Sequence, residues 1–151
     1  MAGCLELKKL SQARLRSSRV LIDAEDWDGA AYLMGHVLET SLKAAACKTL
    51  HLIDYPEMTD NKKVNAMFMT HNFDQLLVIS GLSDLFTVSG PLAISENWSH
   101  FVQEYPGEWI RMRYDPTIFV RFDKIKVEGL YHSLYGSPDS IIKTLGKRKR
   151  W

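Results

Sequence analysis

The sequence has little of several features that mark particular protein classes. It has two cysteines, Cys4 and Cys47, without CxxC spacing and without a signal-peptide pattern, which favours a reduced, cytoplasmic setting over a disulfide scaffold. Neither sign of charge dominates, because nineteen basic and eighteen acidic residues give a net charge of +1. That balance argues against electrostatic binding of nucleic acid or of a membrane by the surface as a whole. The longest apolar stretch is interrupted by His36, Glu39 and Lys43, and is too polar to span a bilayer.

Metal and cofactor motifs are also missing from the sequence. There is no glycine-rich phosphate loop and no internal repeat. His36 and Cys47 are eleven residues apart, about 16 Å along a helix, which is too far to share an ion. The acidic residues between positions 23 and 28 lack the alternation and the glycine of a calcium loop. We therefore expect neither a bound metal nor a cofactor.

Helical periodicity is what the sequence has in abundance. At 151 residues, with 46% hydrophobic and 25% charged residues, the chain suits a single domain with a substantial core. The segment from about 7 to 25 has a narrow seam of small and apolar residues at 3,4 spacing: Leu10, Ala13, Ser17, Val20 and Ala24. A second helix, capped by Asp28 and ending near Leu50, is apolar round most of its circumference. We expect it to be the central, nearly enclosed helix.

The later segments predict shorter helices. Residues 53–66 read as a polar loop, and further helices are expected at 71–82 with Thr70 as cap, at 95–105, and at 117–135. An arginine-rich turn at 110–116 precedes the last of these. A final short helix follows Ser137 as cap and Pro138 as first residue. The prediction is an all-α, up-down bundle of about five helices in one domain, residues 1–146, followed by a basic tail, residues 147–151.

Three stretches carry a resemblance to a known family. "WDGAAYLMGHVLETSLKAAACKTL" at 27–50, followed by "THNFDQLL" at 70–77, resembles the signature of the HEPN family (higher eukaryote and prokaryote nucleotide-binding domain), and "IRMRYDP" at 110–116 is similar to the family's Arg-Tyr-Pro-like turn. The resemblance covers roughly residues 5 to 135. It implies a HEPN-like bundle of about five helices, usually a homodimer. Such domains occur in nucleotidyltransferase partner subunits, toxin–antitoxin pairs and phage-defence systems.

The resemblance also implies two alternative functions, and the sequence favours one of them. Many family members are metal-independent ribonucleases with an arginine, four to six residues, and then a histidine. No arginine in this chain precedes a histidine at that distance. We therefore expect a non-catalytic, dimeric interaction or nucleotide-binding module that is partnered with a nucleotidyltransferase or another effector. The alternative is a ribonuclease with an altered site, in which the fold brings a histidine close to Arg111 or Arg113.

Glu39 and Lys43 are the first candidate residues. They are four residues apart in the order that favours an ion pair on a helix. One interpretation is a buried pair that fixes helix register and dimer packing. The other is a polar site at a groove or dimer seam, where Gly35 would allow a ligand or another helix to approach closely.

The remaining candidates lie in two later stretches. His71 follows the expected cap Thr70 and could bond to the backbone, face Glu39, or act in acid–base chemistry or nucleotide contact. Arg111, Arg113 and Tyr114 combine guanidinium groups with an aromatic ring, which suits phosphate and base contacts, or alternatively bonds to helix ends and carboxylates.

The segment "KRKRW" reads as a solvated basic tail, with an anchor for phosphate or an acidic partner as the alternative. Trp151, unusual in a solvated tail, is expected to dock on a neighbouring chain.

Overall fold

The computed structural model describes residues 2–55, 60–87, 89–115, 117 and 122–151. Helices make up most of these residues, which confirms the all-α prediction. The only strands in the described ranges are two-residue segments, β1 (Ala2–Gly3) and β2 (Asp54–Tyr55), which pair antiparallel with Ala2 opposite Tyr55. None of the described helices is long and apolar enough to cross a membrane.

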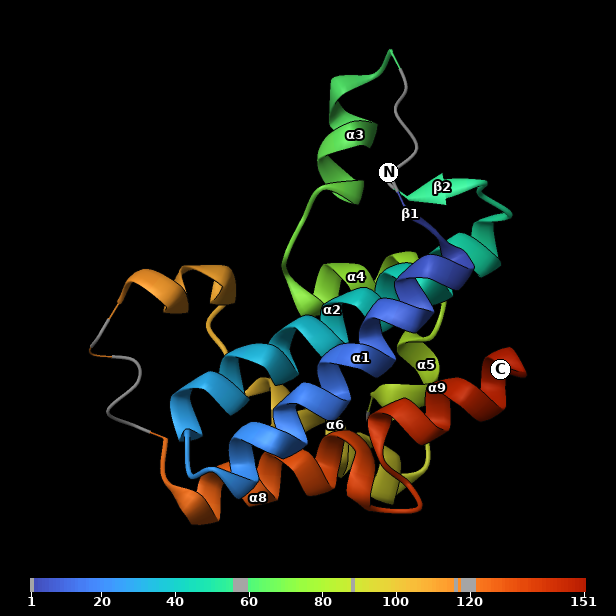
Figure 1. The fold of residues 1–151 in the computed structure, drawn as a ribbon. Coiled ribbons are helices and arrows are strands. Elements are labelled where there is room, and N and C mark those ends of the chain that lie inside the picture. The colour runs from blue at the N-terminus through green and yellow to red at the C-terminus, as the bar shows by residue number, and fades with distance from the viewer. Residues whose placement is uncertain (1, 56–59, 88, 116, 118–121) are drawn as a thin grey trace.

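Two long antiparallel helices form the centre of the molecule, α1 (Cys4–Asp23) and α2 (Trp27–Leu50) (Figure 1). Small side chains let them approach closely. The hydroxyl of Ser11 on α1 lies 2.5 Å from the hydroxyl of Ser41 on α2 and donates to the Val37 carbonyl at 3.2 Å. The thiol of Cys4 reaches the Ala44 carbonyl at 3.4 Å. These contacts fix the register of the pair.

Helix α2 is the enclosed helix that its sequence predicts. It contacts α1, β2, α4, η1, α8 and α9, and it contributes fourteen buried residues to the core. The expected cap, Asp28, is wrong by two positions. Asp26 is the cap, because its carboxylate accepts a hydrogen bond from the Gly29 amide at 3.0 Å, whereas Asp28 lies inside the first turn.

The buried face of α1 also differs from the expected seam. Leu7, Ser11, Ser18 and Ile22 are the buried residues, whereas two members of the predicted seam are exposed, Leu10 by 40% and Val20 by 65%. The buried residues and the predicted seam both follow the spacing of a helix face. Spacing alone therefore could not decide which of the two stripes faces α2. The predicted seam therefore lies toward the surface of this chain.

The segment expected as a loop contains a helix, α3 (Lys62–Phe68). Asn61 begins it, since its side-chain oxygen accepts bonds from the amides of Lys63 and Val64. Phe68 packs edge-on to Tyr55, with ring centroids 5.6 Å apart. No residue of α3 is buried, so apolar periodicity could not reveal it. In Figure 1, α3 and β2 project from the body of the molecule.

Helix α4 (Phe73–Ile79) begins two residues later than expected. Its cap is Asn72, whose side chain accepts from the Gln75 amide at 3.1 Å. Thr70, the expected cap, instead accepts a bond from the Asn72 amide at 3.1 Å. These two bonds order the turn that carries His71.

The rest of the chain forms six further elements: α5 (Ser83–Phe86), α6 (Leu92–Val102), the 3₁₀-helix η1 (Trp109–Tyr114), α8 (Lys124–Tyr131), the π-helical turn η2 (His132–Gly136) and α9 (Ile141–Lys149). The helix expected at 95–105 therefore begins and ends three residues early. The helix expected at 117–135 starts at Lys124 because Asp123 caps it through the Lys126 amide at 2.8 Å; residues 118–121 lie outside the described ranges. The described chain thus holds more helices than the five expected.

The last helix starts later than predicted. Ser137 and Pro138 form a turn, in which the Ser137 carbonyl accepts a hydrogen bond from the Ser140 amide at 3.0 Å. Ser140 then takes the N-cap position of α9. The helix then continues through Lys149, so most of the stretch expected as a separate basic tail is its last turn.

Candidate functional site

Glu39 and Lys43 form a largely buried ion pair on α2. The Lys43 ammonium lies 2.7 Å from Glu39 Oε1, and the two side chains are 15% and 8% exposed. The ammonium also lies over the ring of Tyr55, 5.5 Å from its centroid, which favours the charged form. The pair is therefore positioned by α2, which carries both residues, and by Tyr55 of β2, which contacts Lys43.

His71 also contacts Glu39. Its Nδ1 lies 2.9 Å from Glu39 Oε1, and its imidazole is 44% exposed. An ionised carboxylate can only accept, so Nδ1 carries the proton and donates it. In the neutral ring Nε2 is then free of a proton and can accept one. Glu39 Oε2 is buried and has no hydrogen-bond partner among the described residues.

Arg111 is positioned by η1, which Trp109 anchors. Trp109 is completely buried, and its six-membered ring lies over Gly35 of α2, where a Cβ atom would come within 2.6 Å of the ring. The close approach that Gly35 permits is thus filled by this chain's own tryptophan. The Arg111 guanidinium, exposed to solvent, pairs with Glu108 at 2.7 Å.

The structure brings His71 and Arg111 to one surface depression. This depression, the His71–Arg111 hollow, has a volume of about 360 Å³ and is lined by Met69, Thr70, His71, Glu108, Ile110 and Arg111. It lies between the turn before α4 and η1. The sequence identified His71 and Arg111 of this lining as candidates, but not Glu108 or Ile110. The feature of the sequence that marks these two is their position close to Arg111.

Arg113 and Tyr114 do not join this hollow. The Arg113 guanidinium stacks on the Tyr114 ring, 4.7 Å from its centroid, and the tyrosine is 75% exposed. An exposed guanidinium on an aromatic face remains able to contact phosphate or a base. The two residues therefore form a separate, outward-facing pair at the end of η1.

His36 is a titratable residue near the site that sequence reasoning did not select. Burial is the largest influence on it and lowers its pKa, which the charge of Glu39 partly offsets. The nearby cations Arg14 and Arg113 lower the pKa further. His36 is consequently neutral at pH 7. Its signal in the sequence was its position one turn before Glu39 on the same helix.

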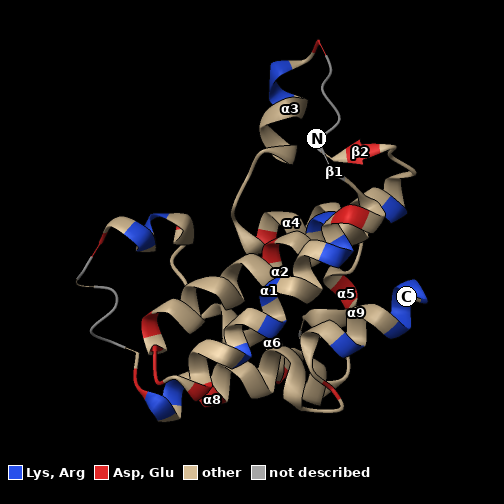
Figure 2. Ribbon diagram, viewed as in Figure 1, with Lys and Arg blue, Asp and Glu red and all other residues tan. Residues whose placement is uncertain are grey.

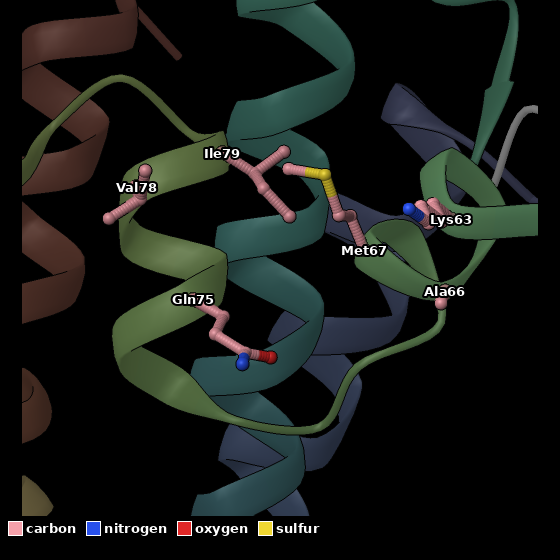
Figure 3. A pocket seen from close by; sticks show the side chains of 6 residues that line it. All are labelled: Lys63, Ala66, Met67, Gln75, Val78 and Ile79. Atoms are coloured by element: carbon pink, nitrogen blue, oxygen red, sulfur yellow. The ribbon is translucent and has the colours of Figure 1, made fainter.

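Another groove lies elsewhere, between α3 and α4. Figure 3 shows its lining, Lys63, Ala66, Met67, Gln75, Val78 and Ile79, around about 370 Å³. Apart from Lys63, these side chains carry no charge, so the groove has no acid–base pair. Its link to the His71–Arg111 hollow is indirect, through the bond from Thr70 to the Gln75 side-chain oxygen at 2.5 Å.

Other chemistries find no support in the described residues. No group of three histidine, cysteine, aspartate or glutamate side chains there could hold a metal ion. Cys47 is buried, and burial raises the pKa of its thiol to about 11, so it is a core residue and not a nucleophile.

Comparison of the chain with protein-family models, curated proteins and solved structures gave no match.

Proposed function

We propose that this protein is a HEPN-like helical subunit that binds the phosphate of a nucleotide or RNA in the His71–Arg111 hollow without turning it over. In this proposal the chain forms a homodimer and works with a nucleotidyltransferase or another effector, in a toxin–antitoxin or defence system. The observation that carries the proposal is the meeting of His71 and Arg111 at one hollow. A guanidinium and an imidazole can both bond to phosphate oxygens.

The charges around the hollow favour binding over catalysis. Lys43 forms an ion pair with Glu39, and Glu39 orients His71 through a contact of 2.9 Å to Nδ1. Arg111 is paired with Glu108 in an exposed ion pair, worth about 0–1 kcal/mol, which a phosphate group can displace. The hollow therefore offers an exchangeable cation beside a fixed histidine.

The homodimer is supported by the exposed face of α1. Leu10 and Val20 project from it, and a groove of about 340 Å³ runs beside it, lined by Leu10, Arg14, Leu33, His36 and Thr40. Exposed apolar residues in a row on a helix are typical of a helix–helix contact.

The first prediction tests phosphate binding. Replacing Arg111 with alanine is expected to weaken binding of a fluorescent mononucleotide about tenfold, because a charge-assisted hydrogen bond contributes about 1.5–3 kcal/mol. The matched control is Arg16→Ala, which removes an exposed arginine from α1 and should leave affinity unchanged. Fluorescence titration measures both. Equal affinity in the Arg111→Ala variant and the unaltered protein would contradict the proposal.

A second candidate function is metal-independent ribonuclease activity with an altered site. It is favoured by the free Nε2 of His71 in the same hollow as Arg111. His71 Nε2 would take the proton of a 2′-hydroxyl, whose oxygen attacks the adjacent phosphorus and expels the 5′-oxygen, which takes a proton from water. Arg111 would stabilise the charge on the phosphate.

Incubation with labelled single-stranded RNA in chelator decides between the two functions. The binding proposal predicts no cleavage above that of buffer. The ribonuclease candidate predicts cleavage that falls about 10²–10⁴-fold in His71→Ala, and not in His132→Ala, a control at an exposed histidine on η2. Cleavage with that pattern would replace the binding proposal.

A further inference from the structure

Five basic side chains gather where α9 ends against the C-terminal end of α2: Lys48, Lys147, Arg148, Lys149 and Arg150. Four of them are exposed, and Lys149 is partly buried. Figure 2 shows the basic ribbon at the end of the chain. We call these five residues the α2–α9 basic surface. In Figure 1 it lies at the opposite edge of the molecule from η1, so it is separate from the His71–Arg111 hollow.

This surface is held in place by contacts that a solvated tail would lack. Lys48 donates to the Lys149 carbonyl. The Lys149 ammonium in turn donates to Thr49 Oγ1 and, at 3.5 Å, to the Ser80 carbonyl. The last turn of α9 is therefore bonded to the ends of α2 and α4. These bonds hold the side chains of Lys48 and Lys149 and the backbone that carries the other three basic residues.

Trp151 strengthens the same attachment. Its amide donates to the Gly146 carbonyl at 3.0 Å, and Lys8 of α1 lies 5.5 Å from the centroid of its ring. The ring packs against the core of this chain. Trp151 thus has contacts within its own chain, and its docking on a neighbouring chain stays a prediction.

The charges of this surface have no ion-pair partner among the described residues, and a carboxylate, Asp139, lines the hollow beside Lys147 and Arg148. Burial lowers the pKa of Lys149, and the charges of Arg148 and Lys48 lower it further. Four of the five lie within residues 147–150, and the remainder of the chain has fifteen basic against eighteen acidic residues. Like charges gathered on one surface create a local positive potential, which attracts anions.

We propose that the α2–α9 basic surface binds the phosphate backbone of a nucleic acid, for which single-stranded RNA serves as the probe. A hollow of about 290 Å³ beside Lys147 and Arg148 gives room for a phosphate group next to two cations; Leu85, Ile94, Asp139 and Thr144 form the rest of its lining. Lysine, arginine and hydroxyl side chains are the usual partners of nucleic-acid phosphates. Asp139, across the hollow, disfavours an anion on its side and directs the phosphate toward the two cations.

The composition of the surface favours nucleic acid over the other anionic partners. A helix that binds a membrane surface needs an exposed apolar face, but Ile141 and Leu145 of α9 are buried in the core. Protein partners are usually held by an apolar or aromatic centre; here Leu85 and Ile94 are the apolar residues that line the hollow, both are partly buried, and the five residues of the surface itself are all basic. Nucleic-acid interfaces are the strongly positive class.

The test is the salt dependence of RNA binding, measured by fluorescence anisotropy with labelled single-stranded RNA. The double variant Lys147→Ala/Arg148→Ala removes two cations and leaves the structural contacts of Lys48 and Lys149 in place. We expect affinity to fall more than tenfold and the slope of log affinity against log salt to become shallower by about 1.4, since each neutralised phosphate contributes about 0.7. Circular dichroism checks that the variant folds.

The matched control is Lys62→Ala/Lys63→Ala, which removes the same charge from exposed positions on α3 and should leave the slope unchanged. An equal loss in both double variants would show that net charge alone matters and would overturn the proposal. So would the absence of RNA binding, or binding to anionic vesicles in its place. Arg111→Ala in the same titration separates this surface from the hollow. In that variant the part of the salt slope that Lys147 and Arg148 contribute should be unchanged.

Discussion

Replacing Lys43 with alanine is expected to lower the free energy of unfolding by about 3–5 kcal/mol, because it leaves the buried Glu39 carboxylate without its cation. Glu39 is only 8% exposed, and one of its oxygens has no hydrogen-bond partner in the described structure. His71 alone, with a proton on Nδ1, would then stabilise the charge. Urea unfolding followed by circular dichroism measures the loss as a shift of the midpoint at constant slope.

Two control variants separate this effect from the loss of an ordinary ion pair. Arg19→Ala breaks the exposed pair with Asp23 at 2.6 Å, whose side chains are 44% and 62% exposed, and should cost less than about 1 kcal/mol. Glu39→Leu/Lys43→Met replaces both buried charges with apolar groups and should recover most of the loss. If Lys43→Ala were as mild as Arg19→Ala, Glu39 would be better solvated than its burial implies.

The long helices and the enclosure of α2 could be predicted because periodicity over twenty or more residues is a strong signal. The exact starts of helices could not. Asp26 and Asp28 are equally good caps by residue type, and only the path of the chain out of α1 decides between them. Thr70 and Asn72 pose the same choice, and their side chains take part in the same turn. Helix α3 was missed because it buries no residue.

The candidate site was predictable in its parts but not in its arrangement. Spacing on one helix places Glu39 beside Lys43, and that contact is present at 2.7 Å. The approach of His71 to Glu39 was one of several alternatives left open by the sequence. The meeting of His71 with Arg111 and not with Arg113 depends on the path of η1, which no local pattern specifies. Gly35 signalled a close approach, but only the structure identifies the tryptophan that makes it.

That tryptophan is the basis of the second large prediction: Trp109→Ala is expected to lower the free energy of unfolding by about 3–5 kcal/mol, through loss of buried apolar surface and the cavity that remains. Trp109 is 0% exposed. Its ring stacks on that of Phe73, with centroids 5.6 Å apart, and meets those of His36 and Tyr105 edge-on. Trp109→Phe, which keeps an aromatic ring at the same position, should lose clearly less. Urea unfolding of the two variants gives the comparison.

Trp109→Ala should weaken mononucleotide binding as well as stability, because Trp109 is the first residue of η1 and Arg111 lies two residues further on. A six-residue 3₁₀-helix has little stability of its own, so its position depends on the buried ring that lies over Gly35. We therefore expect Trp109→Ala to weaken mononucleotide binding about as much as Arg111→Ala does, at a temperature where circular dichroism shows the variant folded. RNA binding at the α2–α9 basic surface should retain its salt dependence. A folded Trp109→Ala variant with unchanged mononucleotide affinity would show that η1 is held by contacts other than its tryptophan.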